Sequence, residues 1–178
     1  MAMGKIYTKK GDKGRTKTFR GEMGKSDALA EALGSIDEVN SWIGVCRQQI
    51  FNYQFLKIDA ALKRIQGNLL TIGSGLAGSK LRIGSGEVRN LEKLIDKLTA
   101  DLPKLTNFIY PVGELQVARS VARRCERRIV SYSLFIDRDK KKVDKKILVY
   151  LNRLSDALFV MARWVNYQRG IGEEVWRG

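Results

Sequence analysis

The stretch Val117–Val130, VARSVARRCERRIV, threads five arginines and one glutamate through a run that otherwise has the pattern of a buried helix. At about 100° per residue, small and apolar side chains share one stripe of this helix: Ala118, Ala122, Cys125 and Ile129. Arg119, Arg123 and Glu126 share a second stripe directly beside it. The stretch therefore predicts a helix that packs into a core and carries charges at the edge of that core.

Two interpretations of the charged stripe are open from this stretch alone. Two guanidiniums one turn apart, beside apolar packing and a carboxylate, suit a multiply charged anion such as a nucleoside triphosphate. The alternative is an ion-pair row on the helix surface, with Arg124, Arg127 and Arg128 as a solvated face. An isolated helix would favour the ion-pair row, but the rest of the sequence favours the anion site.

The composition indicates one basic domain. A chain of 178 residues can bury about 70% of its unfolded surface, so it needs no disulfide or metal to fold. Lys and Arg number 33 against 19 Asp and Glu, and the net charge of +14 favours a nucleotide, a nucleic acid or a membrane surface as partner. Because the chain has no histidine, a Cys/His zinc site and a histidine-based catalytic triad are excluded, and no metal ligands are predicted.

The cysteines and the N-terminal segment bear on the compartment. Cys46 and Cys125 both fall on apolar helix stripes, and two buried thiols fit a reducing cytoplasm. The basic N-terminal segment lacks the apolar run of an export signal, and no run approaches the length of a membrane span. We therefore expect a soluble cytoplasmic protein that does not contact membranes.

From about Ser26 onward the apolar residues repeat at alternating steps of three and four, which predicts helices almost throughout. One repeat is the arginine stretch, and the others are Leu29, Ala32, Ile36, Val39, Ile43, Cys46 and Ile50; Ile58, Leu62, Ile65, Leu69 and Ile72; Val88, Leu91, Ile95 and Leu98; and Ile147, Leu151, Leu154, Leu158, Met161 and Val165. Turn chemistry predicts breaks at Gly73–Gly86, Leu102–Gly113 and Asp137–Lys146. The fold class is all-α, a five-helix bundle with a non-helical N-terminal arm. We expect a single domain over 1–178, with the arm at 1–24, the bundle at 25–170 and a tail at 171–178.

The arm contains the run YTKKGDKGRT at Tyr7–Thr16, which alternates glycine with Lys, Arg and Thr. Such a run lets backbone N–H groups and cationic side chains converge on phosphates, although the spacing is not that of a Walker A loop. A solvated basic tail is the alternative interpretation of this segment.

Polar residues also flank the other apolar repeats. Asp37 and Asn40 lie beside the first repeat, and a carboxylate there is costly unless paired, with Arg119 or Arg123 as the expected partner. The last repeat is flanked in the same way by Asn152, Asp156, Phe159 and Arg163. Phe108, Ile109 and Tyr110 precede Pro111 in an apolar loop, which either packs under the bundle end or forms one wall of an apolar site.

Five motifs in order together resemble the PduO-type ATP:cob(I)alamin adenosyltransferases. They are TKKGDKGRT at 8–16, KSDALAEALGSIDEVN at 25–40, NFIYPVG at 107–113, ARSVARRCER at 118–127 and LNRLSD at 151–156. The resemblance covers nearly the whole chain. It implies a homotrimer of bundles of the ferritin-like, cobalamin adenosyltransferase-like type, with sites between subunits. It also implies transfer of the 5′-deoxyadenosyl group of ATP, bound with Mg²⁺, to reduced cobalamin, with release of triphosphate.

The resemblance assigns roles to individual positions. Asp37 and Arg119 correspond to an inter-subunit salt bridge, and Phe108 to the aromatic residue that occupies the lower face of the corrin. Contacts to ATP are implied for Arg123, Glu126, Arg127 and Asn152, and for the arm residues Thr8, Lys9, Lys10, Gly11, Asp12, Lys13, Gly14 and Thr16 with Lys25. A flavoprotein or other reductase and adenosylcobalamin-dependent enzymes are the implied protein partners.

Three positions depart from the family pattern. Leu29 stands where an arginine is frequent, Pro111-Val112-Gly113 replaces PGG, and the connection from Gly113 to Arg119 is short.

Two other classes of function compete with the enzyme. A non-catalytic trimer that keeps the ATP site is suggested by the altered loop. A basic helical protein that binds nucleic acid is suggested by the net charge, but the basic residues are spread over many helices and no nucleic-acid-binding motif appears.

Overall fold

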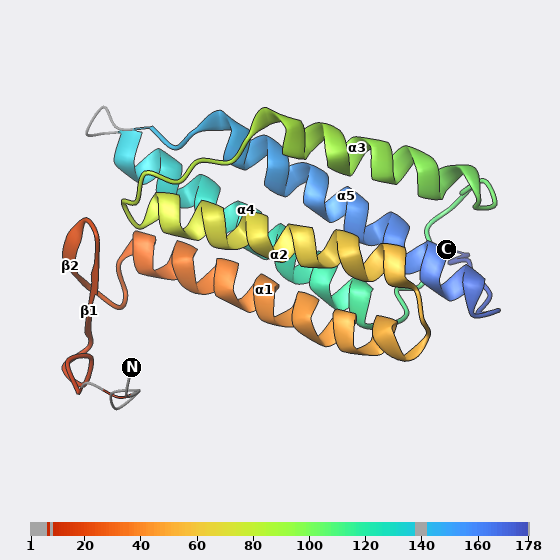
Figure 1. Ribbon diagram of the computed structural model, residues 1–178, viewed down its shortest axis with the longest axis horizontal. Helices are drawn as coiled ribbons and strands as arrows, with labels where there is room; N and C mark the ends of the chain where they lie inside the picture. Colours follow the sequence, from red (N-terminus) through yellow and green to blue (C-terminus); the bar gives the residue numbers. More distant parts are fainter. Residues whose placement is uncertain (1–6, 8, 138–141, 178) are drawn as a thin grey trace.

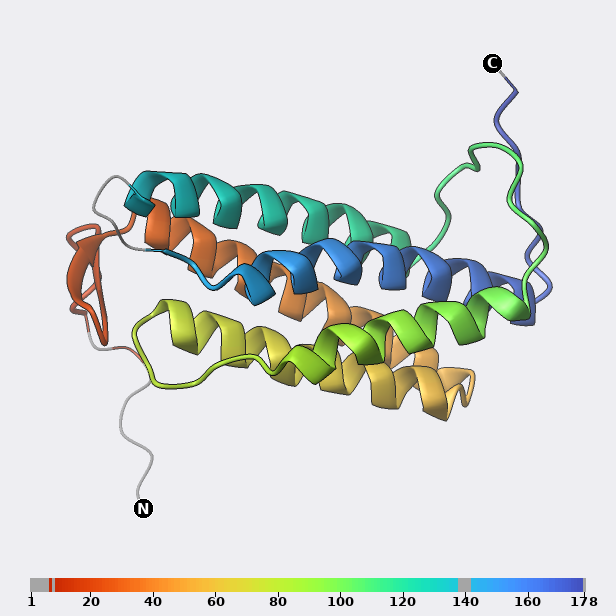
Figure 2. The same cartoon turned by 90° about the horizontal axis from the view of Figure 1, so that it is seen from above.

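The computed structural model is an elongated bundle of five helices with a small β-hairpin at one end (Figure 1). It describes residues 7, 9–137 and 142–177. The elements in chain order are β1 (Arg15–Thr18), β2 (Gly21–Gly24), α1 (Ala28–Asn52), α2 (Leu56–Leu76), α3 (Ser85–Ala100), α4 (Glu114–Asp137) and α5 (Lys145–Gln168). Helix α1 packs against α2 and α4, and α5 packs against α3 and α4 (Figure 2).

The predicted apolar repeats form the core. The stripe of α4 is fully buried at Ala118, Ala122, Cys125 and Ile129, as the helical period predicts. Every residue of the α2 and α5 repeats is buried as well, while in α1 Leu29 is half-buried against the core. The all-α bundle and its five helices are therefore confirmed.

Helix α2 is longer than the turn chemistry predicted, because the break begins after Leu76 and not at Gly73. Ile72 and Leu76 keep the spacing of four, and both are buried. A Cβ at Gly73 would lie 3.7 Å from Ile36 of α1, which is an ordinary van der Waals contact, so this position faces α1 without requiring a glycine. Burial of Leu76 outweighs the low helix propensity of the two glycines before it.

The N-terminal arm is non-helical, as predicted, but it contains an antiparallel hairpin that the sequence did not indicate. Arg15 pairs with Gly24, and Thr18 pairs with Gly21 across the turn. Arg20 Nε donates to the carbonyl of Leu76 at 2.8 Å, so the hairpin caps the end of α2. Gly78 has φ +108, and a Cβ there would lie 2.9 Å from Arg20 Cγ. The hairpin is thus docked on the α2–α3 turn.

None of the described helices has the length and apolarity that a membrane crossing requires.

Candidate functional site

The five arginines of α4 divide into two groups. Arg124 pairs with Glu38 and Arg128 pairs with Glu31 at 3.2 Å, so two of them join α4 to α1. Arg119, Arg123 and Arg127 form no ion pair with any carboxylate in the described part of the chain. Arg124, Arg127 and Arg128 are all exposed, as the interpretation of a solvated face predicts, and two of them also pair with α1. The unpaired group contains the three arginines that the family resemblance singled out.

Arg119 lies at the most enclosed position of the charged stripe. It is half-buried, its Nε donates to Gln116 Oε1 at 2.7 Å, and its Cζ lies 5.9 Å from the centre of the Phe159 ring. Burial lowers the pKa of Arg119, and the neighbouring charge of Arg123 lowers it further. Removal from water and repulsion between like charges both disfavour the cation, so an anion bound here would relieve both penalties.

Glu126 shares the charged stripe with Arg119 and Arg123, but it forms no ion pair with them in the described part of the chain. It is half-buried, and its Oε1 accepts a hydrogen bond from Asn152 Nδ2 of α5 at 3.1 Å. This contact brings together two of the predicted nucleotide-binding residues from different helices. It leaves one carboxylate beside the arginine stripe, with Asn152 exposed next to it.

Asp37 is exposed on α1 and makes no ion pair with Arg119 or Arg123 among the residues described. Its neighbour Glu38 is the residue of α1 that reaches α4. No such pair therefore forms within one described copy of the chain, and the inter-subunit salt bridge that the resemblance implies stays a prediction. A pairing with Arg119 requires a second copy of the chain.

The hairpin and the turn before it gather several of the predicted phosphate-binding residues. A hollow there is lined by Lys10, Gly11, Arg15, Thr16, Lys17, Glu22 and Lys25. Glu22 is paired with Arg15 at 2.7 Å, so the lysines supply most of the remaining charge. Lys9, Asp12, Lys13 and Gly14 form the turn beside this hollow without lining it, and Thr8 lies outside the described residues.

Phe108 is 79% exposed, so the interpretation of this ring as packing under the bundle end is wrong. Its ring meets the edge of Trp176 from the C-terminal tail, with ring centres 6.4 Å apart. The loop is closed by Gly113, whose φ of +97 favours glycine and lets α4 begin at Glu114. The short connection therefore reaches Arg119 within the second turn of α4.

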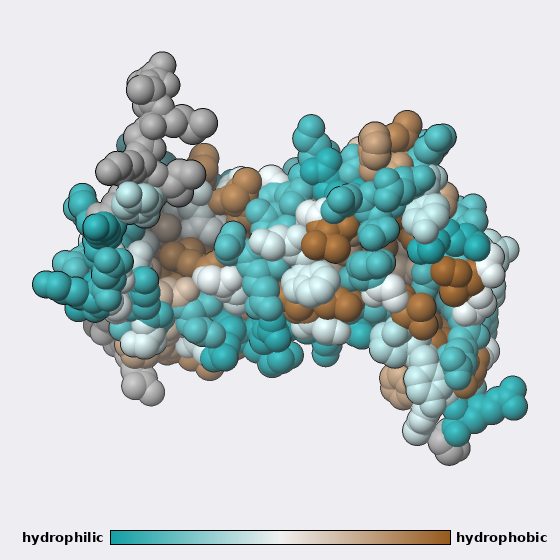
Figure 3. Space-filling view, turned by 90° about the horizontal axis from the view of Figure 1, so that it is seen from below, coloured by the Kyte–Doolittle hydropathy of each residue, from teal (hydrophilic) through white to brown (hydrophobic). Residues whose placement is uncertain are grey.

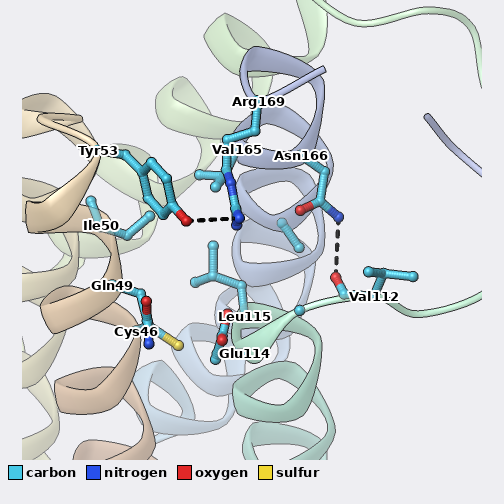
Figure 4. Close-up of a pocket in the computed structure, with 12 residues that line it drawn as sticks. Cys46, Gln49, Ile50, Tyr53, Val112, Glu114, Leu115, Val165, Asn166 and Arg169 are labelled. Carbon is cyan, nitrogen blue, oxygen red and sulfur yellow. Dashed lines mark hydrogen bonds between the residues drawn. The ribbon is translucent and has the colours of Figure 1, made fainter. Parts of the chain in front are cut away.

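A pocket at the same end of the bundle contains none of the predicted site residues (Figure 4). Arg169 donates to Tyr53 Oη at 2.9 Å, and Asn166 donates to the carbonyl of Val112 at 3.1 Å. These contacts join α5 to the end of α1 and to the residues that precede α4. The hydrogen bond from Asn166 holds the backbone just before the start of α4, and because it is accepted by a main-chain carbonyl it does not depend on the valine side chain at position 112.

One copy of the chain keeps the predicted site residues apart. The hairpin stands at one end of the bundle, and the loop before α4 stands near the C-terminus at the other end, with α4 and α5 running between them (Figures 1 and 2). The sequence analysis did not predict two residues of the candidate site, Gln116 and Phe159, which both contact Arg119. The spacing of three between Gln116 and Arg119 was a signal for the first. Phe159 was noticed only as a residue flanking its repeat.

The comparisons with known proteins agree on one family. Residues 6–165 match the sequence model of the cobalamin adenosyltransferases. The corrinoid adenosyltransferase of Bacillus subtilis is 37% identical over 95% of this chain and 90% of its own length, and the human corrinoid adenosyltransferase MMAB is 36% identical over 97% and 73%.

A solved structure supports the same assignment. A variant of the PduO-type ATP:corrinoid adenosyltransferase from Lactobacillus reuteri, complexed with cobalamin and ATP, is 32% identical and has a TM-score of 0.89. The match covers 98% of this chain and 100% of that chain. With its five-helix bundle and its unpaired arginines on α4, this chain belongs to the cobalamin adenosyltransferase family.

Proposed function

We propose that this chain transfers the 5′-deoxyadenosyl group of ATP to the cobalt of cob(I)alamin. Cobalt(I) attacks C5′ of ATP, a Co–C bond forms as the C5′–O bond breaks, and triphosphate leaves with the electron pair. Because the metal of the substrate is the nucleophile, the protein needs no nucleophile of its own. A chain without histidine is compatible with this reaction.

The observation that carries the proposal is the unpaired positive charge on α4. Triphosphate develops high negative charge as it leaves, and catalysis mainly requires cations held in place around it. Arg123 and Arg127 are exposed and lack an ion-pair partner in the described part of the chain, and Arg119 is half-buried beside Arg123. Glu126 and Asn152 lie beside these arginines as candidates for the nucleoside or the metal ion.

Mg²⁺ is proposed to enter with ATP. Within residues 7, 9–137 and 142–177, no group of three or more His, Cys, Asp or Glu side chains is placed to hold a metal ion. Mg²⁺ commonly takes most of its ligands from substrate phosphates and water, with one or two carboxylates from the protein. Glu126 is the carboxylate of the arginine stripe and fits that limited role. The ion would share the charge of the triphosphate with the arginines.

The active form is proposed to be a homotrimer with its sites between subunits. The separation of the hairpin from the loop that precedes α4 supports this arrangement, because a neighbouring copy can supply the missing part of each site (Figure 1). Asp37, exposed on α1, is proposed to meet Arg119 of another copy.

The Asp37–Arg119 pair can be tested by a double-mutant cycle. Asp37→Ala or Arg119→Ala alone should cost about 3–5 kcal/mol of assembly free energy, because each leaves the other charge unpaired in a subunit boundary. The double variant should lose less than the sum of the two. The trimer's dissociation is followed by sedimentation at several concentrations, and activity is measured in parallel. Strict additivity would show that the two residues do not touch.

The hairpin is proposed to close over bound ATP. Mg-ATP should then slow tryptic cleavage at Lys9–Arg20, and removal of residues 1–24 should weaken ATP binding far more than cobalamin binding. The control is cleavage at Lys93 and Lys97 of α3, which should not respond to nucleotide. Equal cleavage of the arm with and without Mg-ATP would show that the arm does not cover the nucleotide and is a solvated tail.

The cell compartment and the protein partners are also proposals. Burial raises the pKa of Cys46 to about 12 and that of Cys125 to about 11, so both remain thiols at neutral pH. Two protected thiols support a reducing cytoplasm as the site of action. The reaction needs cobalt(I), so a flavoprotein or another reductase is proposed to supply the electron, and adenosylcobalamin-dependent enzymes are proposed to receive the product.

The decisive experiment is spectrophotometric. Chemically reduced cobalamin and Mg-ATP are mixed with the protein, and the spectrum of adenosylcobalamin is expected to appear. Binding of ATP without formation of the Co–C bond would instead identify a non-catalytic bundle. A nucleic-acid-binding protein is disfavoured because Arg124 and Arg128 of the basic run are paired with α1. Tight binding to random DNA with a steep salt dependence would instead support a nucleic-acid-binding function.

A further inference from the structure

We propose that Arg163 is a positioning residue that holds the loop of Phe108 in place by tying the C-terminal tail to it. We call residues 102–113 the Phe108 loop and residues 171–177 the tail. The proposal rests on the proposed function, since the loop matters only if Phe108 meets the corrinoid.

Arg163 is a charged side chain in the interior of the bundle end. It is 5% exposed on α5, and its guanidinium makes three hydrogen bonds. Nε and Nη2 donate to the two carboxylate oxygens of Glu173 in the tail, at 2.5 and 3.1 Å, and Nη2 also donates to the carbonyl of Pro103 in the loop at 2.8 Å. One buried cation therefore bonds to the loop and to the tail at the same time.

The tail in turn pairs with the part of the loop that carries the aromatic ring. Ile109 and Val175 form an antiparallel bridge. The amide of Tyr110 donates to the carbonyl of Glu174, and the amide of Trp176 donates to the carbonyl of Phe108, each at 2.9 Å. In the space-filling view the loop and the tail form a spur that projects from the bundle at the end away from the hairpin (Figure 3). Residues 103–108 and 110–113 are exposed, so the tail supplies much of the loop's ordered contact.

Arg163 also contacts the surroundings of Arg119. Its Cζ lies 6.0 Å from the centre of the Phe159 ring, and Arg119 Cζ lies 5.9 Å from the same ring. Both cations, the one that holds the loop and the one of the arginine stripe, therefore lie near the Phe159 ring. The shared ring brings the anchor of the loop close to Arg119 of α4.

The bonding pattern requires an arginine. Its planar fork can satisfy both oxygens of Glu173 and still reach the Pro103 carbonyl, whereas a lysine at this site is a single point charge. Arg163→Lys keeps the charge and removes the fork. Glu173→Gln keeps the size of that side chain and its capacity to accept a hydrogen bond, and it removes the charge that faces Arg163, so it tests the contact from the side of the tail. Arg153→Met is the matched control, because Arg153 on the same helix pairs with Glu92 and Asp156, away from the loop.

The first measurement is hydrogen exchange of the loop and tail segments, followed by mass spectrometry. In the unmodified protein the amides of Tyr110 and Trp176 should exchange slowly, because each donates across the bridge. Arg163→Lys and Glu173→Gln should accelerate exchange in both segments and leave α4 protected, while Arg153→Met should change neither. Unchanged exchange in the loop and the tail would overturn the proposal.

The second measurement separates the two substrates kinetically. Arg163→Lys should lower kcat/KM for cob(I)alamin by up to about a hundredfold, since small misplacements of a contact group cost that much, while KM for ATP stays unchanged. Glu173→Gln should act in the same direction by a smaller factor. An equal loss for both substrates, or no loss despite faster exchange, would overturn the positioning role. If the unmodified protein makes no adenosylcobalamin, the proposed function fails, and the exchange experiment still decides whether Arg163 ties the loop to the tail.

Discussion

Arg123→Ala is expected to slow adenosyl transfer on the order of a hundredfold or more, while the fold and the assembly are retained. Arg123 is exposed on α4 and has no ion-pair partner among the described residues, so its removal leaves no buried charge behind. Its expected contribution is to the charge that triphosphate develops in the transition state, which lowers kcat as well as kcat/KM. Arg123→Lys should rescue poorly, because a bidentate fork becomes a point charge.

The matched control for this variant is Arg124→Ala. It removes the same charge from the neighbouring position of the same helix, but Arg124 is paired with Glu38 of α1. It should therefore affect stability more than turnover. Turnover is measured from the appearance of adenosylcobalamin at saturating Mg-ATP. Near-normal turnover by Arg123→Ala would remove this residue from the mechanism.

Phe108→Ala should abolish most turnover when cobalt must be reduced by a weak reductant, with a loss on the order of a hundredfold. If the ring fills the space below the corrin, it excludes the axial base, leaves cobalt(II) four-coordinate and makes its reduction easier. The melting temperature should hardly change, because the ring is 79% exposed and its truncation leaves no core cavity. ATP affinity and assembly should also be unchanged.

Phe51→Ala is the control for Phe108→Ala, because Phe51 is another exposed ring, at 67%, near the end of α1. The measurements are the spectrum of bound cobalt(II) and the rate with weak and strong reductants. A Phe108→Ala variant that keeps the four-coordinate spectrum would rule out the axial role and point to Tyr110 or to Trp176, which contacts the same loop.

The periodicity of apolar residues was sufficient to predict the helices, because each helix buries one continuous stripe. It located the core of α4 at Ala118, Ala122, Cys125 and Ile129 residue by residue. The end of α2 was placed too early, since glycine at 73 and 75 suggested a turn while Leu76 still had a buried position to fill. The hairpin was missed because its strands are short and lack an apolar face that alternates.

The sequence could predict which residues of the candidate site share one helix face, but it could not predict the contacts between different helices. The stripe of Arg119 and Arg123 follows from spacing, but which arginines are paired depends on the rotation of α1, which presents Glu38 and not Asp37 to α4. The contacts of Arg163 join residues 10 and 60 positions apart through a loop and a tail without regular structure. No periodic pattern encodes such contacts. From the sequence, Arg163 could therefore be recognised only as a polar residue that flanks the apolar repeat of the last helix.

The docking of the hairpin over Gly78 has a genetic consequence. A side chain at position 78 would meet Arg20 and Phe19, and the φ of +108 disfavours one in any case. The helices end before this turn, so a substitution there would displace the arm and spare the bundle. If the arm closes over ATP as proposed, such a variant should fold and bind corrinoid normally, yet it should require a higher concentration of ATP for turnover.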